Sequence, residues 1–510
     1  MRKSVNSFLN QMTIDSNIDY TENGGVTRKS TESKVLDMFA LGGSYRGRSD
    51  EDVILLFKNA YEEDPTLAMK CLFYLRDIRG GQGERRFFRT AFHWLCNEHP
   101  EVATKNLENV SEYGRWDDLI YTTVNTPVEF AAFTLIKHQL ALDVQCKTPS
   151  LLAKWMPSQN ASNVETKRLG HKLACFLNMS SRQYRKTLSI LRERINVLER
   201  LMSANRWDEI EFDKIPSKAG LVYRNAFARR DILAKKYEAF AKSKDTKVNA
   251  EALYPHEIAH QAFNVAGRAS LEDPTRLMLQ KYWDNLKDFY NGREENGLAV
   301  VDVSGSMFGT PLEAAVSMGA YIADKAHGPF ANHFITFSAN PQLVRFEGAD
   351  ITDKFRRCVD ADWGMNTNIK AVFNMLLRTA LKRNVRPEDM PTRLYIFSDM
   401  EFDNCVTFSD APARDRWGYS YRANTVNSIA EANSDLEVIK KEWARYGYQL
   451  PSVIFWNLDA RKNHIPAIGD GFSYVSGFSP SMIDCILSGK DGYDLMLEKL
   501  MSKRYALVSA

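Results

Sequence analysis

Residues 297–307 read Gly-Leu-Ala-Val-Val-Asp-Val-Ser-Gly-Ser-Met, and this stretch decides the fold of the second half of the chain. Its apolar run leads directly into Asp302, Ser304 and Ser306, which form the pattern D-x-S-x-S. A strand that ends there presents one carboxylate and two hydroxyls at its carboxyl edge, where open α/β sheets bind their ligands. Oxygen ligands favour a hard cation, so the stretch predicts a site for Mg²⁺ or Mn²⁺.

The pattern of the chain changes at the polar linker Asn291-Gly-Arg-Glu-Glu-Asn-Gly297. Beyond it, short apolar strands alternate with helices, and this alternation predicts a doubly wound α/β domain with a parallel sheet. The expected strands are Leu298–Val303, His333–Phe337, Arg393–Phe397, Ser452–Trp456 and Phe472–Val475, and the expected helices lie near 311–325, 367–383, 433–447 and 480–505.

Two further segments complete the predicted cation site. Leu394-Tyr-Ile-Phe-Ser-Asp399 is a second apolar strand that ends in a carboxylate, and Trp363-Gly-Met-Asn-Thr367 places a threonine in a loop before a helix. In a parallel sheet Asp302 and Asp399 emerge at the same edge. With Ser304, Ser306 and Thr367, they supply two carboxylates and three hydroxyls, and water completes an octahedron.

These segments together resemble the von Willebrand factor A domain, a Rossmann-like fold with a metal-ion-dependent adhesion site. That site uses D-x-S-x-S, a later threonine and a later aspartate, which match Asp302, Ser304, Ser306, Thr367 and Asp399. The resemblance implies a metal with one open position for an acidic group of a partner, and no activated nucleophile. The alternative is an A domain that keeps the pattern without a metal.

Before residue 290 the sequence reads as helices with short connections. Thr126-Pro-Val-Glu129 predicts a helix start, because a capping threonine and a glutamate flank a proline at the first helical position. Over 181–202, apolar residues at steps of three and four predict one helix with a single stripe. Many short helices in succession indicate stacked pairs, as in α-solenoids. The stripe comprises Tyr184, Leu188, Leu191, Ile195, Leu198 and Met202.

The helical half contains a strongly basic region. Residues 151–250 carry 21 Lys and Arg against 10 Asp and Glu, a net charge of +11, whereas the whole chain carries +3. Such a region is a candidate footprint for a polyanion, most plausibly nucleic acid. The alternative is a solvated helical surface. The basic residues that lie off the stripe, and that should face solvent or a partner, are Arg182, Arg185, Lys186, Arg192 and Arg194.

The helical half also resembles a known family. The segments Tyr74-Leu-Arg-Asp-Ile-Arg-Gly-Gly-Gln-Gly-Glu-Arg-Arg86, Tyr113-Gly-Arg-Trp-Asp-Asp118 and Ile215-Pro-Ser-Lys218 are similar to the TROVE module of Ro proteins. The order of the two modules is closest to that of an uncharacterised sister family. The resemblance implies a flexible segment at 1–30, a TROVE-like helical domain at 31–290 and an A-like domain at 297–510.

The Ro resemblance carries expectations about structure and ligand. It implies a HEAT-like helical ring that the A domain closes, with structured RNA bound on the ring surface and single-stranded RNA ends bound in the hole. Glycines in the turn 80–83, which Arg76, Arg79, Arg85 and Arg86 surround, would let a backbone approach a phosphate. A plain tight turn between helices is the equal alternative. Trp116 and Trp207 are candidate base-stacking residues or core residues.

Other features bear on chemistry and location. His256-Glu257-Ile-Ala-His260 matches the H-E-x-x-H pattern of zinc hydrolases, but no third ligand stands out in the sequence. The cysteines are single, odd in number and without a C-x-x-C pair, which indicates a reducing compartment. No apolar run reaches the roughly 20 residues of a membrane span. We therefore expect a cytoplasmic protein.

The sequence predicts a non-enzymatic, Ro-like RNA-binding protein whose A domain holds a divalent metal ion. The main alternative is a protein–protein scaffold without RNA, whose A domain binds an acidic partner group through the metal. A minor alternative is a zinc hydrolase that uses His256, Glu257 and His260.

Overall fold

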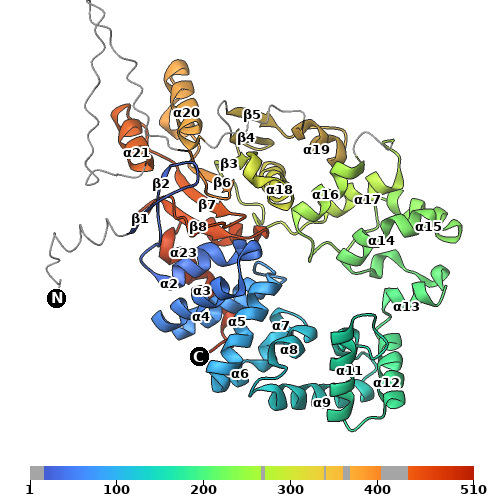
Figure 1. Cartoon of the computed structure of the whole chain (residues 1–510). Helices are drawn as coiled ribbons and strands as arrows, with labels where there is room; N and C mark the ends of the chain where they lie inside the picture. The colour runs from blue at the N-terminus through green and yellow to red at the C-terminus, as the bar shows by residue number, and fades with distance from the viewer. Residues whose placement is uncertain (1–16, 266–269, 338–340, 360–367, 404–434) are drawn as a thin grey trace, which may run out of the picture.

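The chain folds into an all-helical half followed by an α/β domain, and the predicted fold class is therefore confirmed (Figure 1). The computed structural model describes residues 17–265, 270–337, 341–359, 368–403 and 435–510. Residues 1–16 of the expected flexible segment lie outside this part of the chain, and so does the loop 363–367.

Short helices that pack on their neighbours build the helical half. Ser49 and Asp52 cap α3 reciprocally, and Asp64 caps α4, whose first residue is Pro65. The helices are α2 (Lys34–Leu41), α3 (Asp50–Glu63), α4 (Pro65–Arg76), α5 (Arg85–Glu98), α6 (Pro100–Lys105), α7 (Leu107–Tyr113), α8 (Trp116–Thr123), α9 (Glu129–Gln145), α10 (Leu152–Trp155), α11 (Val164–Phe176), α12 (Ser181–Arg194), α13 (Leu198–Ser203), α14 (Ser217–Arg229), α15 (Asp231–Lys242), α16 (Pro255–Val265) and α17 (Pro274–Asp284).

Two details of the predicted helices are wrong. The expected single helix over 181–202 breaks into α12 and α13, because Asn196 adopts a left-handed φ of 49° that asparagine tolerates. The helix expected from Thr126 begins at Glu129 instead. The Thr126 hydroxyl donates to the Thr123 carbonyl at 2.7 Å, and the Glu129 carboxylate accepts from the Asn125 amide at 2.6 Å.

The described part of the α/β domain contains one six-stranded sheet of order β5-β4-β3-β6-β7-β8. All neighbours pair in parallel except β4 and β5. The strands are β3 (Gly297–Asp302), β4 (His333–Phe337), β5 (Gln342–Arg345), β6 (Arg393–Ser398), β7 (Ser452–Asn457) and β8 (Phe472–Ser476), and the helices are α18 (Thr310–Lys325), α19 (Ile351–Val359), α20 (Ile369–Arg383), α21 (Asp435–Arg445), α22 (Ile483–Ile486) and α23 (Gly492–Leu500).

The five predicted strands are all present, but the sequence missed β5 and α19. β5 is an exposed, antiparallel edge strand, so its side chains lack the continuous apolar run of a buried strand. The helix expected over 480–505 is also wrong. It is divided into α22 and α23, because Gly489 between them and Gly492 at the start of α23 adopt left-handed φ angles of 81° and 48°.

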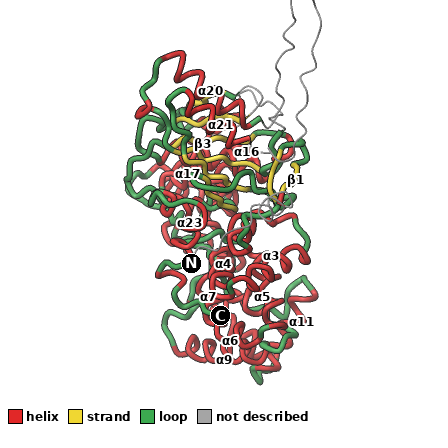
Figure 2. The backbone as a smooth tube through the Cα atoms, turned by 90° about the vertical axis from the view of Figure 1, so that its left-hand side faces the viewer, coloured by secondary structure: helices red, strands yellow, loops and turns green. Residues whose placement is uncertain are grey.

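Both ends of the helical half pack on the α/β domain, and the helices run in an arc between them (Figures 1 and 2). At the first end α2 contacts β8 and α23, and at the second end α16 contacts α18 and α19. The α/β domain therefore closes the arc into a ring within one chain.

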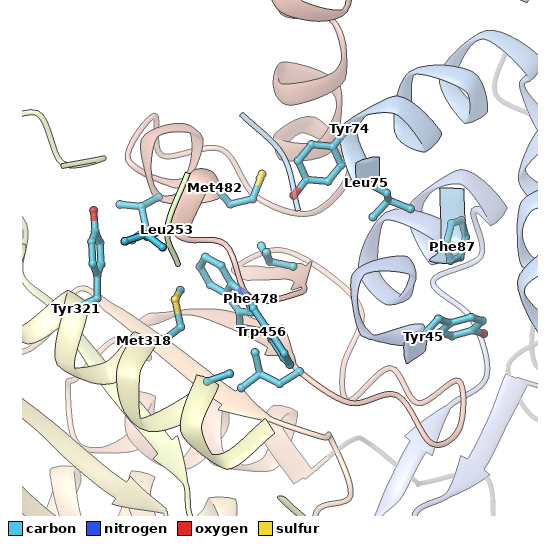
Figure 3. Packing of buried hydrophobic residues seen from close by; sticks show 14 of the residues in the cluster. Tyr45, Tyr74, Leu75, Phe87, Leu253, Met318, Tyr321, Trp456, Phe478 and Met482 are labelled. Carbon is cyan, nitrogen blue, oxygen red and sulfur yellow. The ribbon is translucent and has the colours of Figure 1, made fainter. Parts of the chain in front are cut away.

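Buried polar contacts fix the first closure. Asp77 is fully buried and accepts from the Arg504 guanidinium and, at 3.0 Å, from the Tyr505 hydroxyl. The Lys70 ammonium donates to the Tyr505 carbonyl at 2.8 Å. Figure 3 shows apolar side chains of early helices, such as Tyr74, beside Phe478 and other residues of the α/β domain.

The glycine-rich turn 80–83 belongs to this closure and faces protein. A Cβ at Gly81 would lie 1.8 Å from the Tyr74 carbonyl oxygen, so only glycine fits there. Ser481 donates from its hydroxyl to the Gly81 carbonyl at 3.0 Å, and Gln82 accepts from the Ser479 amide at 3.1 Å. The turn therefore docks the α/β domain, and it is not the phosphate-approach turn that was one of the two alternatives.

The described part of the N-terminal segment forms a hairpin instead of the flexible chain that the sequence predicts. β1 (Ile18–Tyr20) pairs with β2 (Val26–Arg28), and Arg28 bridges to Ile465 of the α/β domain. The Asn17 side chain holds the two ends of the hairpin together, because it donates to the Ser30 carbonyl at 2.9 Å and accepts from the Ser30 amide at 3.0 Å. Hydrogen bonds to distant loops provide much of the attachment of this segment. Its sequence therefore lacks the apolar pattern that would have predicted a packed hairpin.

Candidate functional site

The two predicted carboxylates meet at the carboxyl edge of the sheet. Asp302 ends β3 and Asp399 follows β6, and these strands are parallel neighbours. One Asp302 oxygen accepts from the Ser304 amide at 2.9 Å, and the other accepts from the Ser398 hydroxyl at 2.6 Å. The hydroxyl oxygens of Ser304 and Ser306 lie 3.0 Å apart. Four of the five predicted ligands are therefore on one small loop and one neighbouring strand end.

The electrostatics of this edge fit a cation. Asp302 is fully buried, and burial together with the charge of Asp399 raises its pKa to about 7. Burial also raises the pKa of Asp399, although the Ser306 hydroxyl opposes the shift. Within the described residues, Asp399 Oδ2 is buried without a hydrogen-bond partner. A divalent cation would neutralise the pair and occupy that oxygen.

The fifth predicted ligand, Thr367, lies outside the described residues. The next residue, Asn368, caps α20 by accepting from the Ala371 amide at 2.9 Å. In the part of the chain that the structure describes, no group of three or more His, Cys, Asp or Glu side chains could hold a metal ion. A metal at this edge would therefore depend on two carboxylates supplemented by hydroxyls.

The surroundings of the edge contain residues that the sequence did not single out. Arg461 donates from its guanidinium to the Ser306 carbonyl at 2.5 Å. Glu401 is buried, and its Oε1 lies 2.9 Å from Nδ1 of the buried His464. Although burial raises the pKa of Glu401, hydrogen bonds from His464 and the Glu22 amide hold it below its ordinary value. No spacing in the sequence signals these long-range contacts.

A cavity of about 1820 Å³ lies inside the ring, bordered by helices from both arms of the arc. Among the described residues, its lining contains eight Lys and Arg against three Asp and Glu. The basic residues are Arg79, Arg115, Lys154, Arg185, Arg192, Arg200, Lys218 and Lys287, and the acidic residues are Asp117, Glu199 and Glu251. The excess of positive charge makes the cavity a candidate site for a polyanion.

Aromatic rings lie among these charges. Trp155, Tyr121 and Tyr223 line the cavity. The Arg115 guanidinium sits 4.0 Å from the centre of the Trp155 ring. Burial and the charge of nearby Arg85 lower the pKa of Arg115 to about 10, although Asp117 opposes the shift. Aromatic faces beside cations can stack on bases while the cations contact phosphates.

The basic residues predicted on α12 differ in their surroundings. Arg185 and Arg192 line the cavity, whereas Arg182 and Lys186 are exposed outside its lining. Arg192 does not simply face solvent, because it donates to the carbonyls of Ala153 and Met156 and to the Ser158 hydroxyl at 2.8–3.0 Å. Arg194 donates to the Val144 carbonyl at 2.8 Å. Arg192 and Arg194 thus brace neighbouring segments.

The other aromatic candidates do not reach this cavity. Trp207 is buried under Arg230, whose guanidinium lies 4.6 Å from the ring centre. Trp116 is half-buried against the core. Neither tryptophan lines the cavity. The sequence could not distinguish them from Trp155, since helix α10 is too short to show a periodic pattern.

The H-E-x-x-H residues have separate partners. His256 is half-buried with its Nδ1 enclosed, and this burial, with the charges of Arg46, Lys218 and His260, lowers its pKa to about 3. Glu257 pairs with Lys218, and His260 Nδ1 lies 2.8 Å from Glu313 Oε1. Glu257 and His260 of α16 therefore contact neighbouring elements. Among the described residues, no third metal ligand lies close to these side chains.

The fold and these two sites define a two-module protein, a helical arc closed by an α/β domain. The chain belongs to the family described as domain of unknown function DUF2828, whose model matches residues 21–128 and 134–288. A second model, domain of unknown function DUF7788, matches residues 296–504. The chain is 30% identical to the uncharacterized protein L728 of Acanthamoeba polyphaga mimivirus over 93% of this chain and 85% of that protein. The predicted membership of an uncharacterised two-module family is thereby confirmed.

One solved structure is similar to the whole chain. It is the crystal structure of the Deinococcus radiodurans RO (RSR) protein, with 12% sequence identity and a TM-score of 0.48. The similarity covers 92% of this chain and 99% of that one. Separately, no helix among the residues that the structure describes is long and apolar enough to cross a membrane.

Proposed function

We propose that this protein is a non-enzymatic RNA-binding protein whose ring cavity holds a segment of RNA. The observation that carries the proposal is the cavity of about 1820 Å³, with its excess of Lys and Arg beside half-buried aromatic rings. Phosphates would contact residues such as Lys154 and Lys218, and bases would stack on Trp155. A cytoplasmic location remains a prediction from the sequence.

The metal edge is a separate part of the proposal. Asp302, Ser304, Ser306 and Asp399, with Thr367, would hold Mg²⁺ or Mn²⁺. When bound, the metal would neutralise the carboxylate pair and offer a position for an acidic oxygen of a partner. We assign the edge to binding and not to hydrolysis, because the His–Glu pair that the described residues place near it, His464 and Glu401, is buried, and Glu401 accepts from the N-terminal hairpin.

RNA binding can be tested by fluorescence anisotropy with a labelled single strand and a labelled hairpin at two salt concentrations. Neutralising about three phosphates predicts, between about 50 and 200 mM salt, roughly a 20-fold loss of affinity for the single strand and roughly a 40-fold loss for the hairpin. Lys154→Glu with Lys218→Glu should abolish binding, whereas Lys382→Glu with Arg383→Glu, at the exposed end of α20, should preserve it. Absence of binding at low salt, or equal loss in both variants, contradicts the proposal.

A second candidate function is protein–protein scaffolding through the metal edge. Phe308, two residues after Ser306, exposes 86% of its surface and so offers an apolar contact beside the site. Under this function Asp302→Ala should remove metal-dependent partners from a pull-down and leave RNA affinity unchanged. An unchanged set of partners would exclude this function for the metal edge.

A further inference from the structure

A second pocket lies between α3, the start of α4 and the end of α5. It has a volume of about 580 Å³ and shares no lining residue with the ring cavity. Neither the metal edge nor the proposed RNA site uses it. Its lining consists of Lys58, Tyr61, Glu62, Pro65, Trp94, Glu98 and His99.

Three aromatic rings form the wall of this pocket at mutual angles. The rings of Tyr61 and Trp94 are nearly perpendicular, at 75° with centres 6.5 Å apart. His99 lies 4.7 Å from Tyr61 and 5.6 Å from Trp94, tilted to both. Phe57, fully buried, supports Tyr61 and Trp94 from behind at 5.8 Å. The rings are therefore fixed from the core side and face the pocket as a corner.

The rim of the pocket is acidic. Glu62 and Glu98 are both exposed, and Lys58 is the single basic residue of the lining. The Lys58 ammonium lies 3.8 Å from the Glu62 carboxylate, and both side chains are at least half-exposed, so this pair is weak. Among the described residues, no lysine or arginine stacks on Tyr61 or Trp94. The corner thus combines a buried Tyr61 and the half-buried rings of Trp94 and His99 with net negative charge.

We propose that this corner binds a cationic side chain, a lysine or its methylated form, on a basic segment of a protein partner. An aromatic face attracts a cation through its quadrupole, and tryptophan does so most strongly. The carboxylates of Glu62 and Glu98 add attraction for the same charge. They would repel an RNA phosphate and would contribute nothing to a neutral proline-rich peptide. The proposal is independent of the RNA site and of the metal.

The test uses choline and its neutral isostere 3,3-dimethylbutanol as probes of the full-length protein. With fluorotryptophan incorporated, ¹⁹F NMR follows each indole, and Trp94→Leu identifies the Trp94 signal. Choline should shift that signal saturably. The affinity of the isostere should be lower than that of choline by a factor of at least roughly five. Equal affinity for the two probes, or no shift of the Trp94 signal by choline, overturns the proposal.

A double variant separates charge from shape. Glu62→Gln with Glu98→Gln keeps the pocket and its rings, and should weaken choline binding severalfold while leaving the isostere unaffected. The thermal unfolding midpoint of the variant controls for folding. A third probe, a proline-rich peptide, decides the nature of the partner: its binding to wild type and double variant alike, without a choline response, would overturn the cationic assignment.

Discussion

The backbone amide of Glu22 donates a hydrogen bond of 2.8 Å to the carboxylate of Glu401, 379 positions later in the chain. Beside it, the Thr21 hydroxyl donates to the Phe402 carbonyl at 2.6 Å. The hairpin therefore holds the loop that directly follows Asp399. Within this loop Met400 adopts a φ of 66°, a strained value for a residue with a side chain. External contacts of this kind stabilise such a conformation.

The first prediction concerns this brace. A Cβ at Gly25 would lie 2.6 Å from the Phe402 carbonyl oxygen, so Gly25→Ala should push the hairpin away from the loop. We expect Mn²⁺ affinity, measured by electron paramagnetic resonance, to fall about tenfold, as for other residues that orient metal ligands. Gly47→Ala is the matched control, because no atom lies within 4 Å of its Cβ. Unchanged affinity in Gly25→Ala would show that the hairpin does not position the ligands.

The second prediction concerns the buried carboxylate pair without metal. The folded-state pKa of Asp302, about 7, lies above its unfolded value of 3.8. Stability from this group is thus full below about pH 4 and is lost as the pH rises to about 7. When a chelator keeps the protein free of metal at about pH 8, the unfolding free energy of Asp302→Asn should therefore exceed that of wild type by about 2 kcal/mol.

Thermal unfolding at about pH 5 and about pH 8, with chelator and with Mg²⁺, checks this expectation. Wild type should gain stability from Mg²⁺, and Asp302→Asn should not. Asp470→Asn, at an exposed carboxylate, serves as the control and should behave as wild type. A metal-free Asp302→Asn that is less stable than wild type at the higher pH would refute the repulsion between the two carboxylates.

The sequence correctly placed Asp302 and Asp399 at one edge of the sheet because its signals there are local. Asp302 and Asp399 each end an apolar strand, and parallel neighbours bring strand ends together whatever the rest of the chain does. The burial of Glu401 could not be predicted, for the opposite reason. Its burial depends on a hairpin formed by residues near the start of the chain, and neither periodicity nor spacing records that contact.

The same contrast explains the basic helix α12. The apolar stripe correctly placed Tyr184, Leu188 and Leu191 in the core. It could not reveal that Arg192 satisfies carbonyls at the end of α10, because those acceptors become orphaned only when the helix ends in the folded chain. Net charge therefore located the basic region. It did not show which arginines leave their guanidinium groups available to a ligand and which, like Arg192, use them to bind backbone carbonyls.

The third prediction concerns ring closure. Asp77 is fully buried and binds Arg504 and Tyr505 of the C-terminal segment. Asp77→Ala leaves these donors without their acceptor, and we expect the unfolding free energy to fall by about 2–4 kcal/mol. Hydrogen exchange should increase over 501–510 before global unfolding. The exposed pair Arg386–Asp389 provides the control, since Asp389→Ala should leave stability nearly unchanged. Unaltered exchange over 501–510 in Asp77→Ala would contradict a role in closure.

The fourth prediction concerns the half-buried His256. Burial and the neighbouring charges of Arg46, Lys218 and His260 lower its folded-state pKa to about 3, below the unfolded value of 6.5. A proton therefore binds the unfolded chain more tightly. The stability linked to His256 is full above about pH 6.5 and is lost as the pH falls toward 3, by at most about 1.4 kcal/mol per pH unit.

His256→Gln removes this titration while keeping a polar side chain beside Phe478, whose ring centre lies 4.8 Å from that of His256. Chemical denaturation between about pH 4 and pH 7 should show a shallower decline for His256→Gln than for wild type. The control is His171→Gln, because His171 is exposed on α11 and should leave the slope unchanged. Parallel pH curves for wild type and His256→Gln would contradict the prediction. They would mean that His256 is protonated in the folded chain, although its enclosure beside Phe478 disfavours a charge.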